Sequence, residues 1–361
     1  MRKSRELTNI IKNKTAISPQ KTMLLGAFLF LIPLFSACDS VPSSIQQLSS
    51  QHSSSYSVLP QGKSTNITED FMQVKLRGSL KIKSIKVNSI DVTELSDLAW
   101  DEDEQLLYAI SDEGLLYHLQ ISLKDNKLKS TKVIFATRLK GKSGKKLVGK
   151  YSDSEGLSIL NSNNGVKGDS KLIISFEHKP RIAYYSPKGT FIKKVKIPKE
   201  LSKKKYYRSK NKALESVTHH PKYGIITAAE YPLKKYKKNQ QSLYSSSGKV
   251  WHFPASQATN SAITGLEVLP NGDILLLERA YQNPITPIKI YLRRIKLKEC
   301  NKSHECQTEA IATFDGADGW LLDNFEGLTH YQDNKYLVVS DDNNNPLQKT
   351  ILVLFEIKTA Q

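Results

Sequence analysis

Five segments of the sequence repeat one pattern at intervals close to sixty residues, and this periodicity constrains the fold more than any other feature. In each segment a small or acidic residue, followed by glycine or a substitute, opens an apolar strand. A turn follows, and a second apolar strand ends in a carboxylate. The segments begin 59, 60, 49 and 62 residues apart, which is the length of a large propeller blade. They start at Ser96, Glu155, Glu215, Thr264 and Glu326.

Each interval also contains about four short apolar strands. After Glu155 these read EGLSIL, KLIISFE, RIAYYSP and TFIKKVKI, separated by the turn-forming sequences NSNNG, HKP and PKG. Helical periodicity is nearly absent over the same span. Four-stranded sheets repeated about an axis bury both faces of every sheet and leave few exposed edges. The sequence therefore predicts an all-β fold, a β-propeller of four-stranded blades.

The number of blades depends on how the ring closes. The last repeat has three evident strands, ending in TILVLFEI, and the N-terminal segment FMQVKLRGSLKIKSIKV could supply the fourth. We therefore count five blades, with the ring closed by the N-terminal strand. A sixth blade stays open as an alternative if the N-terminal segment and a long loop form a divergent one, and an open sandwich is the structural alternative.

The N-terminus indicates export. Residues 1–37 combine a basic region with the apolar run MLLGAFLFLIPLFSA and end directly before Cys38, which is typical of a signal peptide. Ser36 and Ala37 before a cysteine resemble a bacterial lipobox, so we expect Cys38 to be lipidated, with ordinary secretion as the alternative. Residues 38–70 are rich in Ser and Gln and predict a flexible tether to the membrane. The propeller domain is then expected over 71–361.

These features place the protein in the bacterial cell envelope, lipid-anchored and facing the periplasm. Asp39 would favour the inner membrane if it acts as a retention signal. The two remaining cysteines, Cys300 and Cys306, lie in a polar stretch with five residues between them. An oxidising compartment predicts a disulfide between them. The alternative is a metal site with His304, which would lack a fourth ligand.

The chain is strongly basic, with a net charge of +18. Removing the leader, which holds six basic residues and one acidic residue, leaves +13. Much of the excess lies in two loops, 193–212 and 234–238. Because the expected location excludes nucleic acid as a partner, we interpret these loops as a solvated, lipid-facing or phosphate-attracting surface. A phosphate-bearing small molecule is therefore an expected ligand, and the oligomeric state stays open.

The recurring acids are the candidate functional residues. Three of the five first positions are carboxylates, and at the strand ends we count five: Asp112, Glu177, Glu230, Glu278 and Asp341. Equivalent positions of a propeller converge on one rim, so we expect these acids to approach one another. Carboxylates brought together in a cleft raise one another's pKa or bind a cation. The sequence contains no nucleophile elbow, P-loop or H-E-x-x-H motif.

The repeats resemble the bacterial phytase-like family, whose domain is called esterase-like activity of phytase. The resemblance runs from about Leu95 to Ile357. It depends on LSDLAWDEDEQLLYAISDEG, on DSEGLSIL with ISFEHKPRI, on NKALESVTHHP, on ITGLEVLPNGDILLLER, and on NFEGLTHY with VSDDN. Membership implies a recurring set of Asp and Glu residues that form an active site.

Two chemical uses of the acids follow. Ca²⁺ held by Glu155, Glu215 and Glu326 could polarise a phosphate ester toward attack by water. A carboxylate pair could instead serve as general acid and base without metal. We expect catalytic roles for the three glutamates just named and for Glu177 and Arg181. Substrate-binding roles are expected for the remaining candidates, which are Asp112, Glu230, Glu278, Arg279 and Asp341.

Two alternatives limit this prediction. Each acid could accept backbone hydrogen bonds or pair with Arg to lock adjacent blades together. The whole propeller could also be a non-catalytic module that binds a ligand or a partner protein at the cell envelope.

Overall fold

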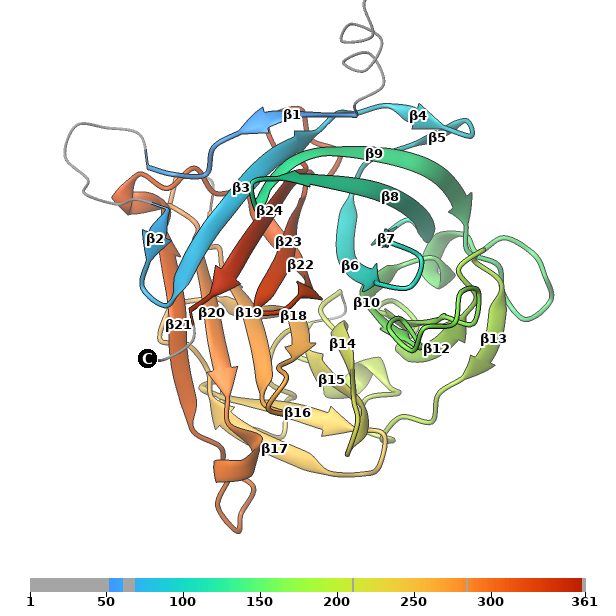
Figure 1. The fold of residues 1–361 in the computed structure, drawn as a ribbon. Helices are drawn as coiled ribbons and strands as arrows, with labels where there is room; N and C mark the ends of the chain where they lie inside the picture. The colour runs from blue at the N-terminus through green and yellow to red at the C-terminus, as the bar shows by residue number, and fades with distance from the viewer. Residues whose placement is uncertain (1–51, 61–68, 210, 284, 359–361) are drawn as a thin grey trace, which may run out of the picture.

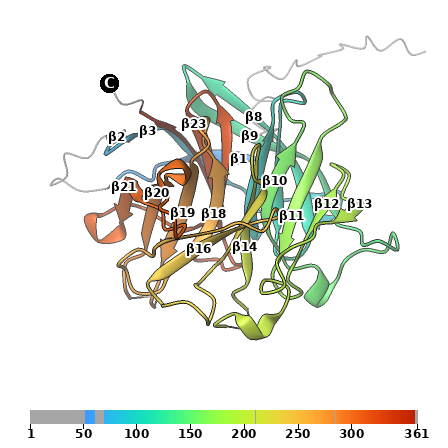
Figure 2. The same cartoon turned by 90° about the horizontal axis from the view of Figure 1, so that it is seen from below.

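The computed structural model describes residues 52–60, 69–209, 211–283 and 285–358. Five antiparallel sheets of at least four strands surround a common axis. Figure 1 looks along this axis, with the innermost strand of each sheet nearest the centre. Figure 2 views the ring from the side, with strands β10, β14 and β18 running between its two faces. The predicted five-bladed propeller is confirmed, and the N-terminal strands join the fifth blade rather than forming a sixth.

Four blades are continuous in sequence. Blade 1 contains β6 (Leu95–Asp101), β7 (Leu106–Ser111), β8 (Leu115–Lys124) and β9 (Lys127–Arg138). Blade 2 contains β10 (Ser154–Leu160), β11 (Lys171–Phe176), β12 (Arg181–Tyr185) and β13 (Phe191–Lys194). Blade 3 contains β14 (Leu214–His220), β15 (Gly224–Ala229), β16 (Gln240–Ser245) and β17 (Val250–Pro254). Blade 4 contains β18 (Ser261–Val268), β19 (Ile274–Ala280), β20 (Lys289–Ile295) and β21 (Thr308–Asp315).

The fifth blade joins the two ends of the domain. Its C-terminal strands are β22 (Asn324–Gln332), β23 (Lys335–Asp341) and β24 (Ile351–Ile357). The N-terminal β3 (Val74–Ile82) pairs antiparallel with β24, with Leu80 opposite Leu352. β1 (Ser53–Tyr56) and β2 (Asp70–Phe71) both pair with β3. The N-terminal strand therefore closes the ring by backbone hydrogen bonds, as the sequence predicted.

The remaining described elements are short. A hairpin is formed by β4 (Lys86–Val87) and β5 (Ile90–Asp91), and four 3₁₀ turns are η1 (Gly149–Tyr151), η2 (Lys204–Tyr206), η3 (Leu297–Glu299) and η4 (Gly316–Asp318). Over the described ranges, no helix has the length and apolar character needed to span a bilayer.

The predictions for the N-terminal segment, a signal peptide followed by a tether, have different outcomes. The predicted signal peptide 1–37 and Cys38 lie outside the described residues. The tether prediction for 38–70 is wrong for Ser53–Tyr56, which forms β1 along the edge of β3, and Val58 is buried. An edge strand is held by main-chain hydrogen bonds, so a Ser-rich segment without core side chains can still join a sheet.

Cys300 and Cys306 form a disulfide in the connection between β20 and β21, with an S–S distance of 2.02 Å. Because the two sulfurs bond to each other, they do not form the alternative metal site with His304. The bond closes the short loop that was predicted from the spacing of the two cysteines.

Apolar side chains fill the five spaces between adjacent blades. Successive residues of one strand point to opposite neighbours, because side chains alternate across a sheet. In β7, Leu107 packs in the space toward blade 5, and Tyr108 packs in the space toward blade 2. In β19, Ile274 faces blade 3, and Leu275 faces blade 5. Sheets covered on both faces need continuous apolar strands, which explains the runs read from the sequence.

Every innermost strand contains a bulge at the first position of the repeat. The pairing register shifts at Ser96 in β6, at Glu155 and Gly156 in β10, and at Glu215 in β14. It shifts again at Thr264 in β18 and at Glu326 in β22. A bulge leaves one residue outside the ladder and redirects its side chain. The repeated small or acidic residue, followed by glycine or by Asp97 and Ser216 in its place, is therefore the sequence signature of a bulge.

Glycine follows the first repeat position in three of the five inner strands, β10, β18 and β22, because the innermost strands lie very close together. A Cβ at Gly156 would lie 2.8 Å from Ser216 Cα and Val217 N of β14. A Cβ at Gly327 would lie 2.7 Å from Asp97 Cα of β6. Both contacts are with backbone, which cannot move aside as the end of a side chain can.

We therefore expect Gly156→Ala to lower the free energy of unfolding by about 1–3 kcal/mol, because the methyl group forces β10 and β14 apart. Urea unfolding monitored by tryptophan fluorescence measures the change. Gly141→Ala is the control, since its nearest contact is the end of the Leu147 side chain at 3.2 Å. Equal stability of the Gly156 and Gly141 variants would contradict the close approach of the strands.

Candidate functional site

A large acidic pocket opens where the bulges of the inner strands meet the ends of the second strands. Its volume is about 830 Å³. Glu155, Glu215 and Glu326, the three acidic bulge residues, all line it. Among the described residues, the charged side chains that line it are Asp112, Glu155, Glu177, Glu215, Glu230, Asp323, Glu326 and Asp341, with Lys212 and Arg279 as the cations. Eight of the ten side chains selected from the sequence thus share one pocket.

Glu278 is one of the two that lie elsewhere, and strand register explains why. In blade 5, Ser340 pairs with the residue before the bulge, and Asp341 is the next residue. In blade 4, Glu278 pairs with Ile263, the residue before the bulge. Arg279 therefore occupies the position that Asp341 occupies in blade 5. A shift of one residue turns a side chain to the other face of the sheet. The prediction of five strand-end carboxylates is therefore wrong: there are four, with Arg279 as the fifth member.

Glu278 instead forms an ion pair of 2.8 Å with Arg293 of β20 and is fully buried. Arg181 also lies outside the residues that line the pocket. Its guanidinium stacks on the Phe176 ring at 3.6 Å and donates to the carbonyl oxygens of Tyr151 and Lys179. These contacts give both residues a packing role, in contrast to the substrate-binding and catalytic roles expected for them.

Arg279 connects three blades across the pocket. Its Nη1 donates to Glu326 Oε1 of blade 5 at 2.6 Å, and its Nη2 lies 4.0 Å from Glu230 Oε1 of blade 3. Lys212, just before β14, donates to the same Glu230 oxygen at 2.6 Å. Glu230 and Glu326 are therefore paired with cations, as the structural alternative for the repeated acids predicts.

Glu155 and Glu215 are different, because neither has a hydrogen-bond or ion-pair partner among the described residues. Glu215 is only 9% exposed. One carboxylate oxygen of Asp112 is also buried without a partner. A buried carboxylate normally accepts hydrogen bonds, since desolvating it otherwise costs several kcal/mol. Glu155 and Glu215 therefore present carboxylate oxygens to the pocket that accept no hydrogen bond from the described residues.

The pKa values of the pocket acids reflect the same excess of carboxylates over cations. Burial, and then the neighbouring carboxylates, raise the pKa of Glu155 and of Glu215 well above the usual value. Burial and Asp153 raise the pKa of Glu177 to about 7, and burial with the charge of Glu94 raises that of Asp112 to about 7. Burial and Glu326 raise the pKa of Asp341 to about 8. Several of these groups consequently share protons near neutral pH.

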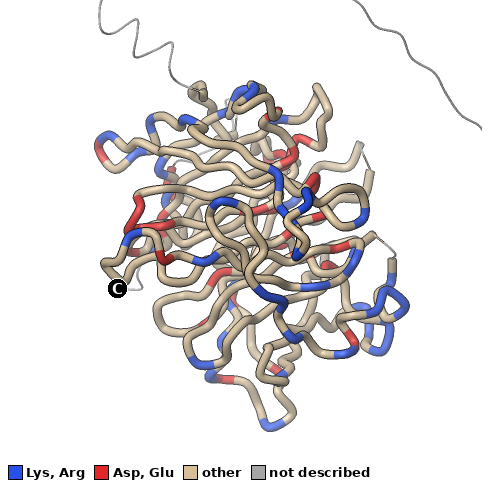
Figure 3. Tube along the Cα trace, turned by 90° about the vertical axis from the view of Figure 1, so that its right-hand side faces the viewer, with Lys and Arg blue, Asp and Glu red and all other residues tan. Residues whose placement is uncertain are grey.

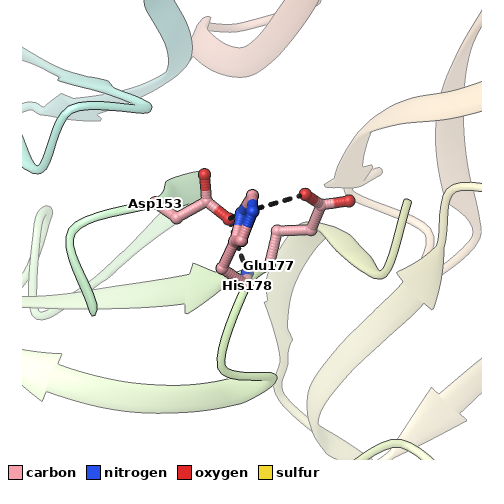
Figure 4. A group of neighbouring side chains, drawn as sticks. All are labelled: Asp153, Glu177 and His178. Carbon is pink, nitrogen blue, oxygen red and sulfur yellow. Dashed lines mark hydrogen bonds and ion pairs between the residues drawn. The ribbon is translucent and has the colours of Figure 1, made fainter. Parts of the chain in front are cut away.

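Two groups of three side chains bring their ligand atoms within 4.8 Å of one another. One is Glu177, Glu215 and Glu230. The other is Asp153, Glu177 and His178, drawn in Figure 4. His178 Nδ1 contacts Asp153 Oδ2 and lies 3.6 Å from Glu177 Oε2. The predicted metal set of Glu155, Glu215 and Glu326 is not one of these groups, since Glu326 is turned toward Arg279.

Sequence reasoning assigned no role to Asp153 and Lys212. Asp153 precedes Glu155 by two residues in DSEGL, and Lys212 lies three residues before Glu215 in NKALES. Both positions lie next to recognised repeat residues, which was the available signal. His219 and His330 line a separate cavity of about 200 Å³, together with Glu267 and other residues of the inner strands beyond the bulges.

The surface has the opposite charge to the pocket. Lys and Arg are distributed over the outer loops, with a dense group on a loop at the right of Figure 3. The basic excess of the sequence therefore belongs to the exterior, whereas many of the acids are gathered inside one cavity.

The chain was compared with known proteins. The model of the family described as phytase-like, esterase-like activity of phytase, matches residues 90–344. No curated protein matches the sequence. Among solved structures, the Dos1 propeller is similar at 11% identity over 78% of this chain and 74% of that one, with a TM-score of 0.33. The Neurospora crassa Pan2 WD40 domain is similar at 10% identity over 81% of this chain and 98% of that one, with a TM-score of 0.35.

The family match spans four complete blades and the two innermost strands of the fifth, β22 and β23, and includes every acid that lines the pocket. The chain therefore belongs to the phytase-like family, esterase-like activity of phytase.

Proposed function

We propose that the protein is a lipid-anchored, periplasm-facing hydrolase that cleaves phosphate or other esters in the acidic pocket, with a divalent cation such as Ca²⁺ held there. The observation that carries this proposal is the pair of unpartnered glutamates, Glu155 and Glu215, inside a pocket of eight carboxylates. So many acids cannot all be ionised in one cavity without a cation.

Glu177, Glu215 and Glu230 fit a hard cation best. One oxygen of each lies within 4.8 Å of the others, and Glu215 has no hydrogen-bond or ion-pair partner in the part of the chain that the structure describes. Glu177 Oε1 accepts from Ala213 N at 2.8 Å and Glu230 Oε1 from Lys212, which leaves the second oxygen of each available. Ca²⁺ takes six to eight oxygen ligands, so these carboxylates with water form a suitable set. The bound ion would supply positive charge to an ester oxygen.

Where no cation is bound, the protein's own acids can provide the proton transfers instead, since a carboxylate that ligates a cation is not free to exchange protons. Burial and the charge of Glu215 raise the pKa of Glu155, and burial and the charge of Glu230 raise the pKa of Glu215. One member of such a pair stays protonated near neutral pH while the other is ionised. The ionised member accepts a proton from the attacking water, and the protonated member donates its proton to the leaving alcohol oxygen.

The pocket mouth also has an apolar side, formed by Tyr281, Ile288 and Leu347. Leu347 is 85% exposed and Tyr281 is 47% exposed. These side chains can contact the uncharged part of an ester. They favour a substrate in which an organic group accompanies the ester bond.

We expect the full chain to hydrolyse at least one member of a panel of phosphomonoesters, phosphodiesters and carboxyl esters in the presence of Ca²⁺. Glu215→Gln should lower kcat/KM by about 100-fold, because it removes one of the three carboxylates that hold the cation. Glu299→Gln, on the exposed η3 turn, is the matched control and should stay within about twofold of the unchanged protein. Absence of turnover across the panel would favour the non-catalytic binding module.

The raised pKa values also predict a stability profile. A carboxyl whose pKa is raised on folding stabilises the fold fully below its unfolded pKa, and this contribution is lost as pH rises through the folded value. Without metal we expect the melting temperature to fall between about pH 4 and pH 8, the range set by Glu177, Asp112 and Asp341.

Ca²⁺ binds the ionised carboxylates, so the melting temperature with Ca²⁺ minus that with EDTA should increase with pH. Scanning calorimetry at pH 5 and pH 8 measures both effects. Glu215→Gln should reduce the Ca²⁺ effect, and Glu299→Gln should leave it unchanged. A Ca²⁺ effect of equal size at both pH values would contradict a site made of these acids.

A further inference from the structure

The outer side of blade 2 carries nearly all the excess positive charge of the chain. Two segments that contain no Asp or Glu build it. The connection from β9 to β10, 139–152, has five lysines, and 178–199, which includes β12 and β13, has six lysines and Arg181. These twelve cations compare with a net charge of +13 for the chain without its leader, so the remainder is close to neutral. We call the two segments together the blade-2 surface.

The two segments lie side by side. Lys140 N donates to the carbonyl oxygen of Gly189 at 2.8 Å, and the Arg181 guanidinium donates to that of Tyr151. β13 is the outermost strand of its blade, so this surface belongs to the rim of the ring. β13 lies at the right of Figure 1, and Figure 3 views the molecule from that side.

The lysines of this surface are not neutralised within the protein. In the part of the chain that the structure describes, none of the eleven forms an ion pair with a carboxylate. Aromatic rings are their neighbours instead. Lys150 Nζ and Lys179 Nζ each lie 5.9 Å from the centre of the Tyr151 ring, and Lys193 Nζ lies 4.9 Å from that of Tyr184. The positive charge is therefore available to a partner.

Apolar side chains are exposed among these lysines. Val148 is 66% exposed, Tyr151 is 49% exposed and Ile192 is 43% exposed. Water hydrates the lysines but not these apolar groups, and a soluble polyanion would also leave them in water. An anionic bilayer accepts both, because its headgroups attract cations and its interface takes up apolar and aromatic side chains.

We propose that the blade-2 surface docks on an anionic lipid bilayer, with Val148 and Ile192 entering the interface and the lysines contacting the headgroups. Docking through the rim leaves the acidic pocket open to water, since the pocket opens near the axis of the ring. The inference goes beyond the proposed hydrolysis and does not depend on it.

The proposed lipid anchor would assist this docking. Cys38 precedes the first described residue, His52, by fourteen positions, which span at most about 50 Å of extended chain. A tether of this length keeps the domain at a high local concentration beside the bilayer, so weak contacts are sufficient to orient it.

The test places a fluorescent reporter on the surface. Val148→Trp is introduced into the full chain, which is reconstituted into vesicles of phosphatidylcholine with brominated acyl chains, with or without phosphatidylglycerol. We expect quenching of the new indole by bromine to increase at least threefold when phosphatidylglycerol is present. The three native tryptophans are at most 5% exposed and give a constant background. Val166→Trp, on the β10–β11 connection at 52% exposure, is the matched control and should show no increase.

Charge variants test the role of the lysines. Lys142→Glu, Lys145→Glu and Lys146→Glu together should abolish the increase in the Val148→Trp background. The same change of charge at the exposed Lys249, Lys298 and Lys302 of blades 3 and 4 should preserve it. All six side chains are exposed, so both sets should keep the melting temperature. The N-terminal segment is identical in every variant and cannot account for a difference between them.

Three results would overturn the inference: equal quenching in neutral and anionic vesicles, an equal loss in the two triple variants, or equal quenching of Val148→Trp and Val166→Trp. Binding to the soluble polyanion dextran sulfate, without quenching in anionic vesicles, would assign the surface to a polyanion instead. Hydrolysis is read separately. The lysines changed here do not line the acidic pocket, so turnover of a water-soluble ester should be the same in the triple variant and the unchanged protein.

Discussion

Two buried carboxylates near the axis hold the five innermost strands together. Asp97 of blade 1 accepts backbone N–H groups from Leu157 of blade 2, at 2.6 Å, and from Leu328 of blade 5, at 2.9 Å. Glu267 of blade 4 accepts from His330 N of blade 5 at 2.9 Å and from Thr218 Oγ1 of blade 3. Together the two acids connect all five blades. Burial raises the pKa of both, although these hydrogen bonds favour the ionised forms. The blade-locking role considered for the repeated acids is thus filled mainly by two others.

This close arrangement of the strands creates the site. Strands that touch at Gly156 and Gly327 leave no room for a side chain at those two positions, and the bulge directs the residue before each glycine away from the ladder. Three of the five bulge residues are glutamates, and they meet the acids at the second-strand ends in one cavity. The repulsion among them opposes folding, and the five apolar layers between the blades offset it. A cation would relieve the repulsion, which connects the stability of the ring to ligand binding.

Charge is separated over a short distance in this protein. A second cavity, lined by the cations Arg208, Lys234 and Lys238, shares Lys212 with the acidic pocket, and the pairing of Lys212 with Glu230 marks the boundary between them. The apolar side chains Tyr281 and Leu347 line the mouth of the acidic pocket.

The sequence by itself determined the repeat, the four strands of each blade, the closure by the N-terminal strand and most of the pocket acids. These follow from local patterns: apolar runs, turn residues and the bulge signature. Only the tertiary structure decided that Arg279 rather than Glu278 reaches the pocket, because a one-residue difference in register reverses the direction of a side chain. It also decided that Glu326 pairs with Arg279, that Asp153 and Lys212 belong to the site, and that a basic pocket adjoins it. Such contacts join segments tens of residues apart, and their distances depend on how the blades pack rather than on any local pattern.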